Sequence, residues 1–168
     1  FATVTNVGTN YPTLVNAVDT TAAGATEILT GVIADSVTRP SAFSVLSYLG
    51  GSSSEGTAAA TGSDQAAAVV TATNTHYYIG GTTTSTDVPG ATGGAQATNG
   101  GGAYDALLAR IPVNGSAGTG FQTSYLGGTG DDRIGGIAYD TLADRLLIFG
   151  TTTGSFPVLN TTPASNFY

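Results

Sequence analysis

The pentapeptide SYLGG occurs twice in this chain, at residues 47–51 and again at residues 124–128. The step along the chain from Tyr48 to Tyr125 equals the step from Pro12 to Pro89, and we call this spacing the repeat interval. Self-similarity at a fixed spacing is typical of arrays of supersecondary units, each of which cannot bury its apolar face alone. The duplicated pentapeptide therefore predicts a repetitive architecture.

Other segments recur in the same order around these landmarks. IGGTTTSTDVP at 79–89 returns as IFGTTTGSFP at 148–157. GAYDALLARI at 102–111 has a weaker counterpart in GATEILTGVI at 24–33, where Glu27 corresponds to Asp105. We therefore interpret residues 1–168 as one repeat region: the second half of a repeat at 1–47, a complete repeat at 48–124 and the first half of another at 125–168.

Strand signals dominate each repeat, because Thr, Val, Ile, Tyr and Phe occur in short runs bounded by Gly, Ser, Asn and Pro. Two hairpins with short turns are expected, and two further strands with them. These segments are 66–73 with 75–81, 134–140 with 144–150, 104–111 and 121–128. Four strands per repeat predict one compact antiparallel sheet, and no long helix is expected.

The stretch SYLGGTGDDRIGGIAYDTLADRLLIFGTTTGSFP at 124–157 resembles the repeat of the bacterial SBBP proteins, which are named for a seven-bladed β-propeller. The resemblance implies an all-β fold of two repeated four-stranded antiparallel units like propeller blades. The incomplete repeats at both ends of the sequence further allow these units to be completed by strands from neighbouring subunits. It also implies a secreted or cell-surface protein and offers no catalytic residues. The first copy departs from the pattern, because its YLGG continues without Gly-Asp-Asp and Thr71 replaces the strand-ending Asp140.

The repeated motif itself is expected to be structural. Its tyrosines and leucines should be largely buried at equivalent positions, and its glycines should end a strand where a side chain would crowd the next turn. These residues are Tyr48, Leu49, Gly50 and Gly51 in the first copy and Tyr125, Leu126, Gly127 and Gly128 in the second.

Composition excludes several classes of partner. The chain has four Arg, no Lys and eleven acidic residues, for a net charge of −7. Nucleic acids and anionic membrane surfaces both require clustered basic residues, so neither is expected to bind. No apolar run approaches the length of a membrane span, and the absence of Cys excludes disulfides and thiolate metal sites.

Calcium is the only ion for which the sequence offers a motif. GGTGDDRIG at 127–135 fits the calcium-binding nonapeptide, but that site needs tandem copies and the chain has one. We therefore interpret it as a glycine-rich turn in which Asp131 and Asp132 accept hydrogen bonds from local backbone N–H groups, and no cofactor is expected. Asn114 and Asn160 begin N-glycosylation sequons.

No catalytic signature is present, so the chain is not expected to be an enzyme. Two blades cannot close a ring that needs four to eight. The sequence therefore predicts a structural subunit of an extracellular filament or surface layer, in which copies assemble head-to-tail by strand complementation through their terminal strands, such as residues 1–7. The alternative is a fragment of a closed SBBP-type propeller that binds carbohydrate or protein. A propeller enzyme acting on polysaccharide lacks a supporting set of carboxylates.

Overall fold

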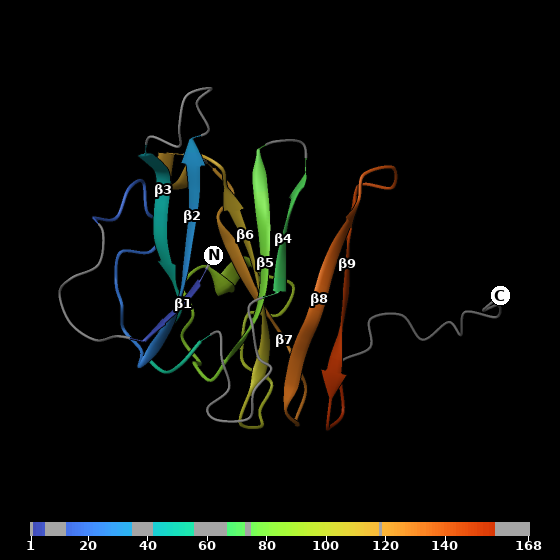
Figure 1. Ribbon diagram of the computed structural model, residues 1–168. Helices are drawn as coiled ribbons and strands as arrows, with labels where there is room; N and C mark the ends of the chain where they lie inside the picture. The colour runs from blue at the N-terminus through green and yellow to red at the C-terminus, as the bar shows by residue number, and fades with distance from the viewer. Residues whose placement is uncertain are drawn as a thin grey trace.

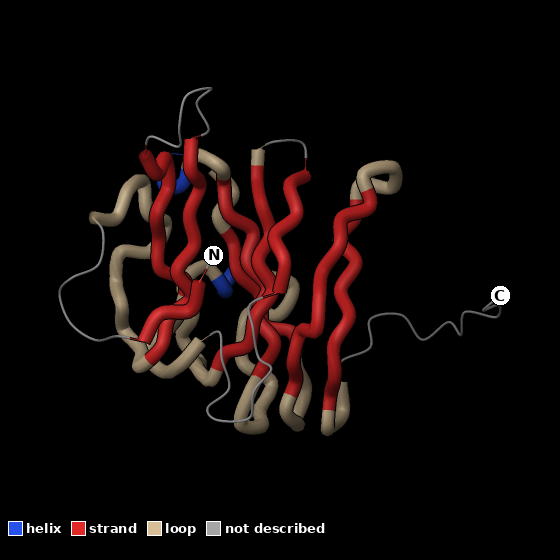
Figure 2. Tube along the Cα trace, in the orientation of Figure 1, coloured by secondary structure: helices blue, strands red, loops and turns tan. Residues whose placement is uncertain are grey.

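The computed structural model describes residues 2–5, 13–34, 42–55, 67–72, 75–117 and 119–156. Antiparallel strands make up most of these residues, and the helical segments among them are two single 3-10 turns (Figure 2). In chain order the elements are β1 (Ala2–Thr5), β2 (Thr26–Ala34), β3 (Ala42–Leu49), β4 (Ala67–Ala72), β5 (His76–Thr83), η1 (Ala91–Gly93), β6 (Asp105–Pro112), η2 (Gly115–Ala117), β7 (Gln122–Leu126), β8 (Asp132–Asp140) and β9 (Arg145–Thr152).

The strands form three sheets that stand side by side as layers (Figure 1). The N-terminal sheet has the order β1-β2-β3, the central sheet has the order β4-β5-β6-β7, and β8 pairs with β9 in the C-terminal hairpin. All pairs are antiparallel. The expectation of an all-β antiparallel fold is confirmed, whereas the described strands form no closed ring and only one of their sheets has four strands.

The central sheet is covered on both faces because its side chains alternate between them. Tyr77 and Ile79 of β5 belong to the core shared with the N-terminal sheet, whereas Tyr78 packs against the C-terminal hairpin. Gly80 and Gly81 follow in β5, and a side-chain carbon at either one would press on an isoleucine of the adjacent layer. The paired glycines thus let the layers approach β5 closely from both sides.

The two cores differ in size. The core between the N-terminal and central sheets holds ten buried residues, with Ile28 and Leu49 from one sheet meeting Leu107, Ile111 and Tyr125 from the other. The core between the central sheet and the hairpin holds three among the residues whose side chains are described: Ala106, Ile134 and Ile137. Most of the apolar burial described here therefore lies on one face of the central sheet.

Strand registers match the expectations from sequence at the hairpins and the repeated motif. β4 pairs with β5 and β8 with β9 across short turns, as predicted. Leu107 lies opposite Tyr125 in the central sheet, and Leu29 lies opposite Tyr48 in the N-terminal sheet. Both copies of SYLGG therefore end a strand in the same register on its neighbour. The sequence also places a longer stretch between YLGG and the hairpin in the first copy than in the second, and residues 56–66 of that stretch lie outside the described residues.

Candidate functional sites at the sheet junctions

The serine hydroxyl of each SYLGG accepts hydrogen bonds from a loop that lies along the outer edge of its strand. The Ser47 hydroxyl accepts hydrogen bonds from the N–H groups of Val18 (3.1 Å) and Asp19 (3.0 Å). The Ser124 hydroxyl accepts one from the N–H of Gln96 (2.9 Å). Gln96 follows Asp19 by the repeat interval. Each loop pairs with the strand beside it, so the outer edges of β3 and β7 are covered within the chain.

The tyrosine and leucine of the motif are buried to different extents in the two copies. Tyr125 and Leu49 are fully buried, and the Tyr125 hydroxyl accepts a hydrogen bond from the Val88 N–H (3.0 Å). Tyr48 and Leu126 are half-buried, so the side chains at equivalent positions of the two copies are not buried equally. The reason is position: Tyr125 faces the N-terminal sheet, whereas the face of the N-terminal sheet that carries Tyr48 has no described sheet of this chain against it.

The first glycine of the motif leaves room for a pair of buried carboxylates. A side-chain carbon on Gly50 would lie less than 3.0 Å from both Glu27 Oε2 and Glu55 Oε2. Glu27 Oε1 accepts a hydrogen bond from the Gly24 N–H (2.7 Å), and Glu55 Oε1 accepts from the hydroxyls of Thr83 (2.9 Å) and Ser85. Both Oε2 atoms are buried and have no hydrogen-bond partner. We call this arrangement the Gly50 junction.

The same arrangement recurs around Gly127, and we call it the Gly127 junction. A side-chain carbon there would lie less than 3.0 Å from Asp105 Oδ1 and Asp132 Oδ2. Asp105 Oδ2 accepts from the Gly100 N–H (2.6 Å), and Asp132 Oδ2 accepts from the Gly128 N–H (2.7 Å). The Oδ1 atoms of both aspartates are buried without a hydrogen-bond partner. Glycine is needed at both positions because the carboxylates occupy the space of a side chain.

Burial raises the pKa of three of these carboxyl groups, those of Glu27, Glu55 and Asp105. It raises the pKa of Glu27 to about 7, and repulsion from Glu55 and Asp19 adds to the effect, against the Gly24 N–H. Burial also raises the pKa of Glu55, opposed by the Ser85 and Thr83 hydroxyls. The pKa of Asp105 rises for the same reason, and the charge of Asp132 contributes. Neither pair has a basic partner among the described residues, where the ion pair found joins Arg145 to Asp140.

Asp131 and Asp132 both accept hydrogen bonds from backbone N–H groups, but only Asp132 does so locally. Asp132 Oδ2 accepts from the Gly128 N–H of the same glycine-rich turn (2.7 Å), as predicted, and Asp132 also belongs to the Gly127 junction. Asp131 Oδ1 accepts instead from the Ala103 N–H (2.7 Å), which is distant in sequence. Sequence reasoning missed Glu55, which precedes Asp132 by the repeat interval and bridges to Thr83 in the manner that Asp132 pairs with Thr152. Applying the repeat interval residue by residue would have found it.

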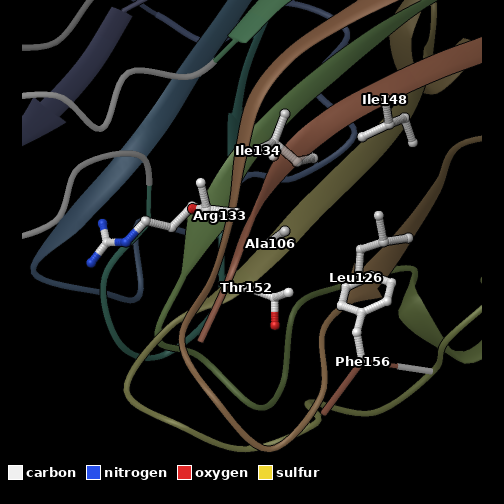
Figure 3. A pocket seen from close by; sticks show the side chains of 9 residues that line it. Ala106, Leu126, Arg133, Ile134, Ile148, Thr152 and Phe156 are labelled. Atoms are coloured by element: carbon white, nitrogen blue, oxygen red, sulfur yellow. The ribbon is translucent and has the colours of Figure 1, made fainter. Parts of the chain in front are cut away.

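A pocket of about 280 Å³ opens between the central sheet and the hairpin (Figure 3). Its walls are mostly apolar. Ala106 corresponds in the repeat to Ile28, which fills the larger core, so a smaller side chain faces the hairpin at this position. The lining residues are Ala106, Leu126, Arg133, Ile134, Ile148, Gly150, Thr151, Thr152 and Phe156.

Two exposed apolar faces lie at opposite sides of the layered structure. The outer face of the hairpin carries Leu147 (50% exposed) and Phe149 (65% exposed). The N-terminal sheet exposes Ile33 (53%) and Phe43 (41%), which lie opposite each other in β2 and β3. Exposed apolar clusters of this kind are typical of interaction surfaces.

Two edge segments also lack a strand partner among the described residues. β1 covers β2 only from residue 26 to residue 29, so residues 30–34 of β2 have an open edge on that side. β9 pairs with β8 on one side only. Unpaired backbone N–H and C=O groups on such edges are a template for a strand of another chain.

The remaining sites expected from sequence lie at the periphery or outside the described residues. Asn114 is exposed in the turn after β6, and Asn160 lies outside the described residues. No described helix is long and apolar enough to cross a bilayer. Within the described ranges, no three His, Cys, Asp or Glu side chains gather as a metal-binding group.

Comparison with known proteins finds no matching family model, curated protein or solved structure. The likeness to the SBBP repeat therefore depends on the quoted motifs alone.

Proposed function

We propose that this protein is a structural subunit that assembles head-to-tail with copies of itself into an extracellular or cell-surface filament or layer. The observation that carries the proposal is the match between the two incomplete sheets. If the central sheet is a complete blade, the N-terminal sheet has no counterpart of β4 among the described strands, and the hairpin has no described counterparts of β6 and β7. In this reading the hairpin of one copy and the N-terminal sheet of the next form one composite blade.

The central sheet supplies a template for that composite blade. In β5–β6, Ile79 lies opposite Ala109 and Tyr78 lies opposite Arg110. The repeat alignment transfers these pairs to Ile148 with Gly31 and to Leu147 with Val32, now between two copies. The segments that pair are residues 145–149 of β9 and residues 30–34 of β2, whose edge is open on that side among the described residues. Residues 150–152 of β9 would continue along the part of β2 that β1 covers, so β1 would have to move aside there.

The composite blade also places a sheet against the half-buried side chains on the outer face of the N-terminal sheet. Leu29 and Tyr48 of the second copy would face the hairpin-side surface of the first copy's central sheet, as Leu107 and Tyr125 face the N-terminal sheet within one chain. The pocket beside Ala106 lies where this contact would form. A head-to-tail contact of this kind either closes a ring or continues as a filament, and we favour the filament.

Sedimentation and electron microscopy of the purified protein test the proposal. The unmodified chain should form filaments, and the double variant Leu147→Ser with Phe149→Ser should remain a folded monomer, because it makes the exposed outer face of β9 polar. Leu142→Ser is the matched control, since Leu142 is 98% exposed in the turn of the same hairpin and should leave assembly intact. An unmodified chain that stays monomeric at high concentration, or filaments that survive the double variant, would contradict the proposal.

A further inference from the structure

The buried carboxylate pairs at the Gly50 and Gly127 junctions need a partner that the rest of the described chain does not supply. Glu27, Glu55, Asp105 and Asp132 are each at most 1% exposed. An ionised carboxylate in such surroundings is strongly destabilised unless a cation, a proton or sufficient hydrogen bonds compensate it. Hydrogen bonds account for one oxygen of each side chain and leave the other without a partner.

The geometry brings the oxygens of each pair to one place. At the Gly50 junction the two unpartnered oxygens, Glu27 Oε2 and Glu55 Oε2, both approach the position of a missing Gly50 side chain. At the Gly127 junction, the unpartnered Asp105 Oδ1 and Asp132 Oδ2, which also accepts from the Gly128 N–H, approach the corresponding position. In both cases the space between two carboxylates is kept free of carbon by a glycine.

The chemistry of these oxygens fits a hard divalent cation. Calcium binds six to eight oxygen ligands at about 2.3–2.6 Å, and carboxylates, carbonyls and waters all serve. Calcium also tolerates irregular geometry, whereas magnesium demands a nearly ideal octahedron. Each junction supplies two carboxylates, and waters or backbone carbonyls would complete the shell.

The recurrence of the pair argues against a local accident. Asp132 follows Glu55 by the repeat interval, and Asp105 follows Glu27 by one position more than that interval. The side chains differ in length between the junctions, yet both junctions keep two carboxylates around the first glycine of YLGG. We propose that each junction binds one calcium ion, held by Glu27 with Glu55 at the first and by Asp105 with Asp132 at the second, so that the cation joins neighbouring layers of the sheet stack.

This proposal does not depend on assembly, because both junctions lie within one chain. It differs from the nonapeptide prediction, since Asp131 is committed to the Ala103 N–H and takes no part. The competing explanation is a proton shared by each carboxylate pair. The two explanations make opposite predictions about added calcium at a pH where carboxylic acids are ionised.

Equilibrium dialysis and thermal unfolding of the full chain distinguish them. Chelator-treated protein at pH 8 should bind two calcium ions, with dissociation constants on the order of 10⁻⁴ to 10⁻³ M, as in extracellular calcium modules. Millimolar CaCl₂ should raise the melting temperature by about 5 °C or more, and MgCl₂ or NaCl at the same ionic strength should do much less.

Isosteric variants locate the ions. Glu27→Gln with Glu55→Gln, and Asp105→Asn with Asp132→Asn, keep the side-chain volumes and should each reduce the stoichiometry from two ions to one. Both pairs of substitutions together should abolish binding and the calcium-dependent rise in melting temperature. Asp140→Asn is the control, because Asp140 lies at the exposed hairpin turn and pairs with Arg145; it should leave two ions bound.

Several results would overturn the proposal. These are a stoichiometry other than two, a stoichiometry that the isosteric variants leave unchanged, or a protein whose melting temperature calcium does not move. If calcium has no effect at pH 8 while the isosteric variants raise the melting temperature and acidification does the same, the pairs share protons and bind no cation.

Discussion

The two faces of the central sheet are covered to different extents by the neighbouring layers. On the face toward the N-terminal sheet, ten buried residues fill the space between the layers. On the face toward the hairpin, three of the residues whose side chains are described are buried, and a pocket of about 280 Å³ remains. The difference teaches that, within the described residues, the two-stranded hairpin covers its face of the central sheet less completely than the three-stranded sheet covers the other.

One pair of corresponding positions concentrates this difference. Ile28 of β2 packs into the larger core, and its methyl group lies against Gly81 of β5. Ala106 of β6 corresponds to Ile28 in the repeat. It faces the hairpin and lines the pocket together with Gly150. A substitution of isoleucine by alanine removes several carbon atoms from contact, so part of the pocket follows directly from sequence.

The largest effect that we expect separates the two tyrosines of the repeated motif. Tyr125→Ala should lower the free energy of unfolding by about 3–5 kcal/mol, because it removes a fully buried ring and a hydrogen bond to the Val88 N–H. Tyr48→Ala in the half-buried copy should cost roughly 1 kcal/mol in the monomer. Urea denaturation of both variants measures this contrast. Equal losses in the free energy of unfolding would mean that the two tyrosines are packed equally well.

Ile28→Ala should have the next largest effect. It creates a cavity in the well-packed core, and the expected loss is about 3 kcal/mol in the free energy of unfolding. The measurement is again urea denaturation, with Ile33→Ala as a matched control on the same strand, since Ile33 is half exposed and should lose much less. If Ile28→Ala were nearly neutral, the larger core would not be as tightly packed as the structure indicates.

The reciprocal substitution should have the smallest effect and the opposite sign. Ala106→Ile places at the pocket the side chain that Ile28 has in the larger core, and it should stabilise the monomer by about 1 kcal/mol. A rise in melting temperature with retained near-ultraviolet circular dichroism checks it. A destabilised variant would mean that an isoleucine does not fit between the central sheet and the hairpin. The same variant should also weaken assembly, if a second copy fills that pocket.

Much of this fold is predictable from the spacing of short motifs. The two hairpins and the strand ends at SYLGG follow from β-branched runs, turn residues and the repeat interval, all of which can be read along the chain. The burial of Tyr48 is not predictable in this way, because two identical pentapeptides differ only in what lies against their sheets. Burial depends on neighbours from distant parts of the chain, which local spacing does not specify.

The carboxylate pairs show a second limit of sequence reasoning. Glu27 and Asp105 can be matched as corresponding residues, and the repeat interval also matches Glu55 with Asp132, although SSSEG and TGDDR share few letters. The correspondence of residues does not show which carboxylates meet in space. That becomes visible only when the structure places each pair around a glycine, where charge rather than residue identity repeats.

Disulfide trapping between copies tests the head-to-tail assembly most directly. The chain has no cysteine, and β9 and β2 belong to layers on opposite sides of the central sheet (Figure 1), so a bond between them must join two molecules. The double variants L147C with V32C and L146C with I33C each place two cysteines directly opposite each other in the composite blade. Because neighbouring pairs in an antiparallel ladder alternate in type, one of the two is a non-hydrogen-bonded pair, whose side chains are closely spaced. Mild oxidation should convert at least one of these variants into a ladder of covalent oligomers on a non-reducing gel, whereas the control L142C with V32C should give only random dimers. No more cross-linking than in that control would contradict the assembly.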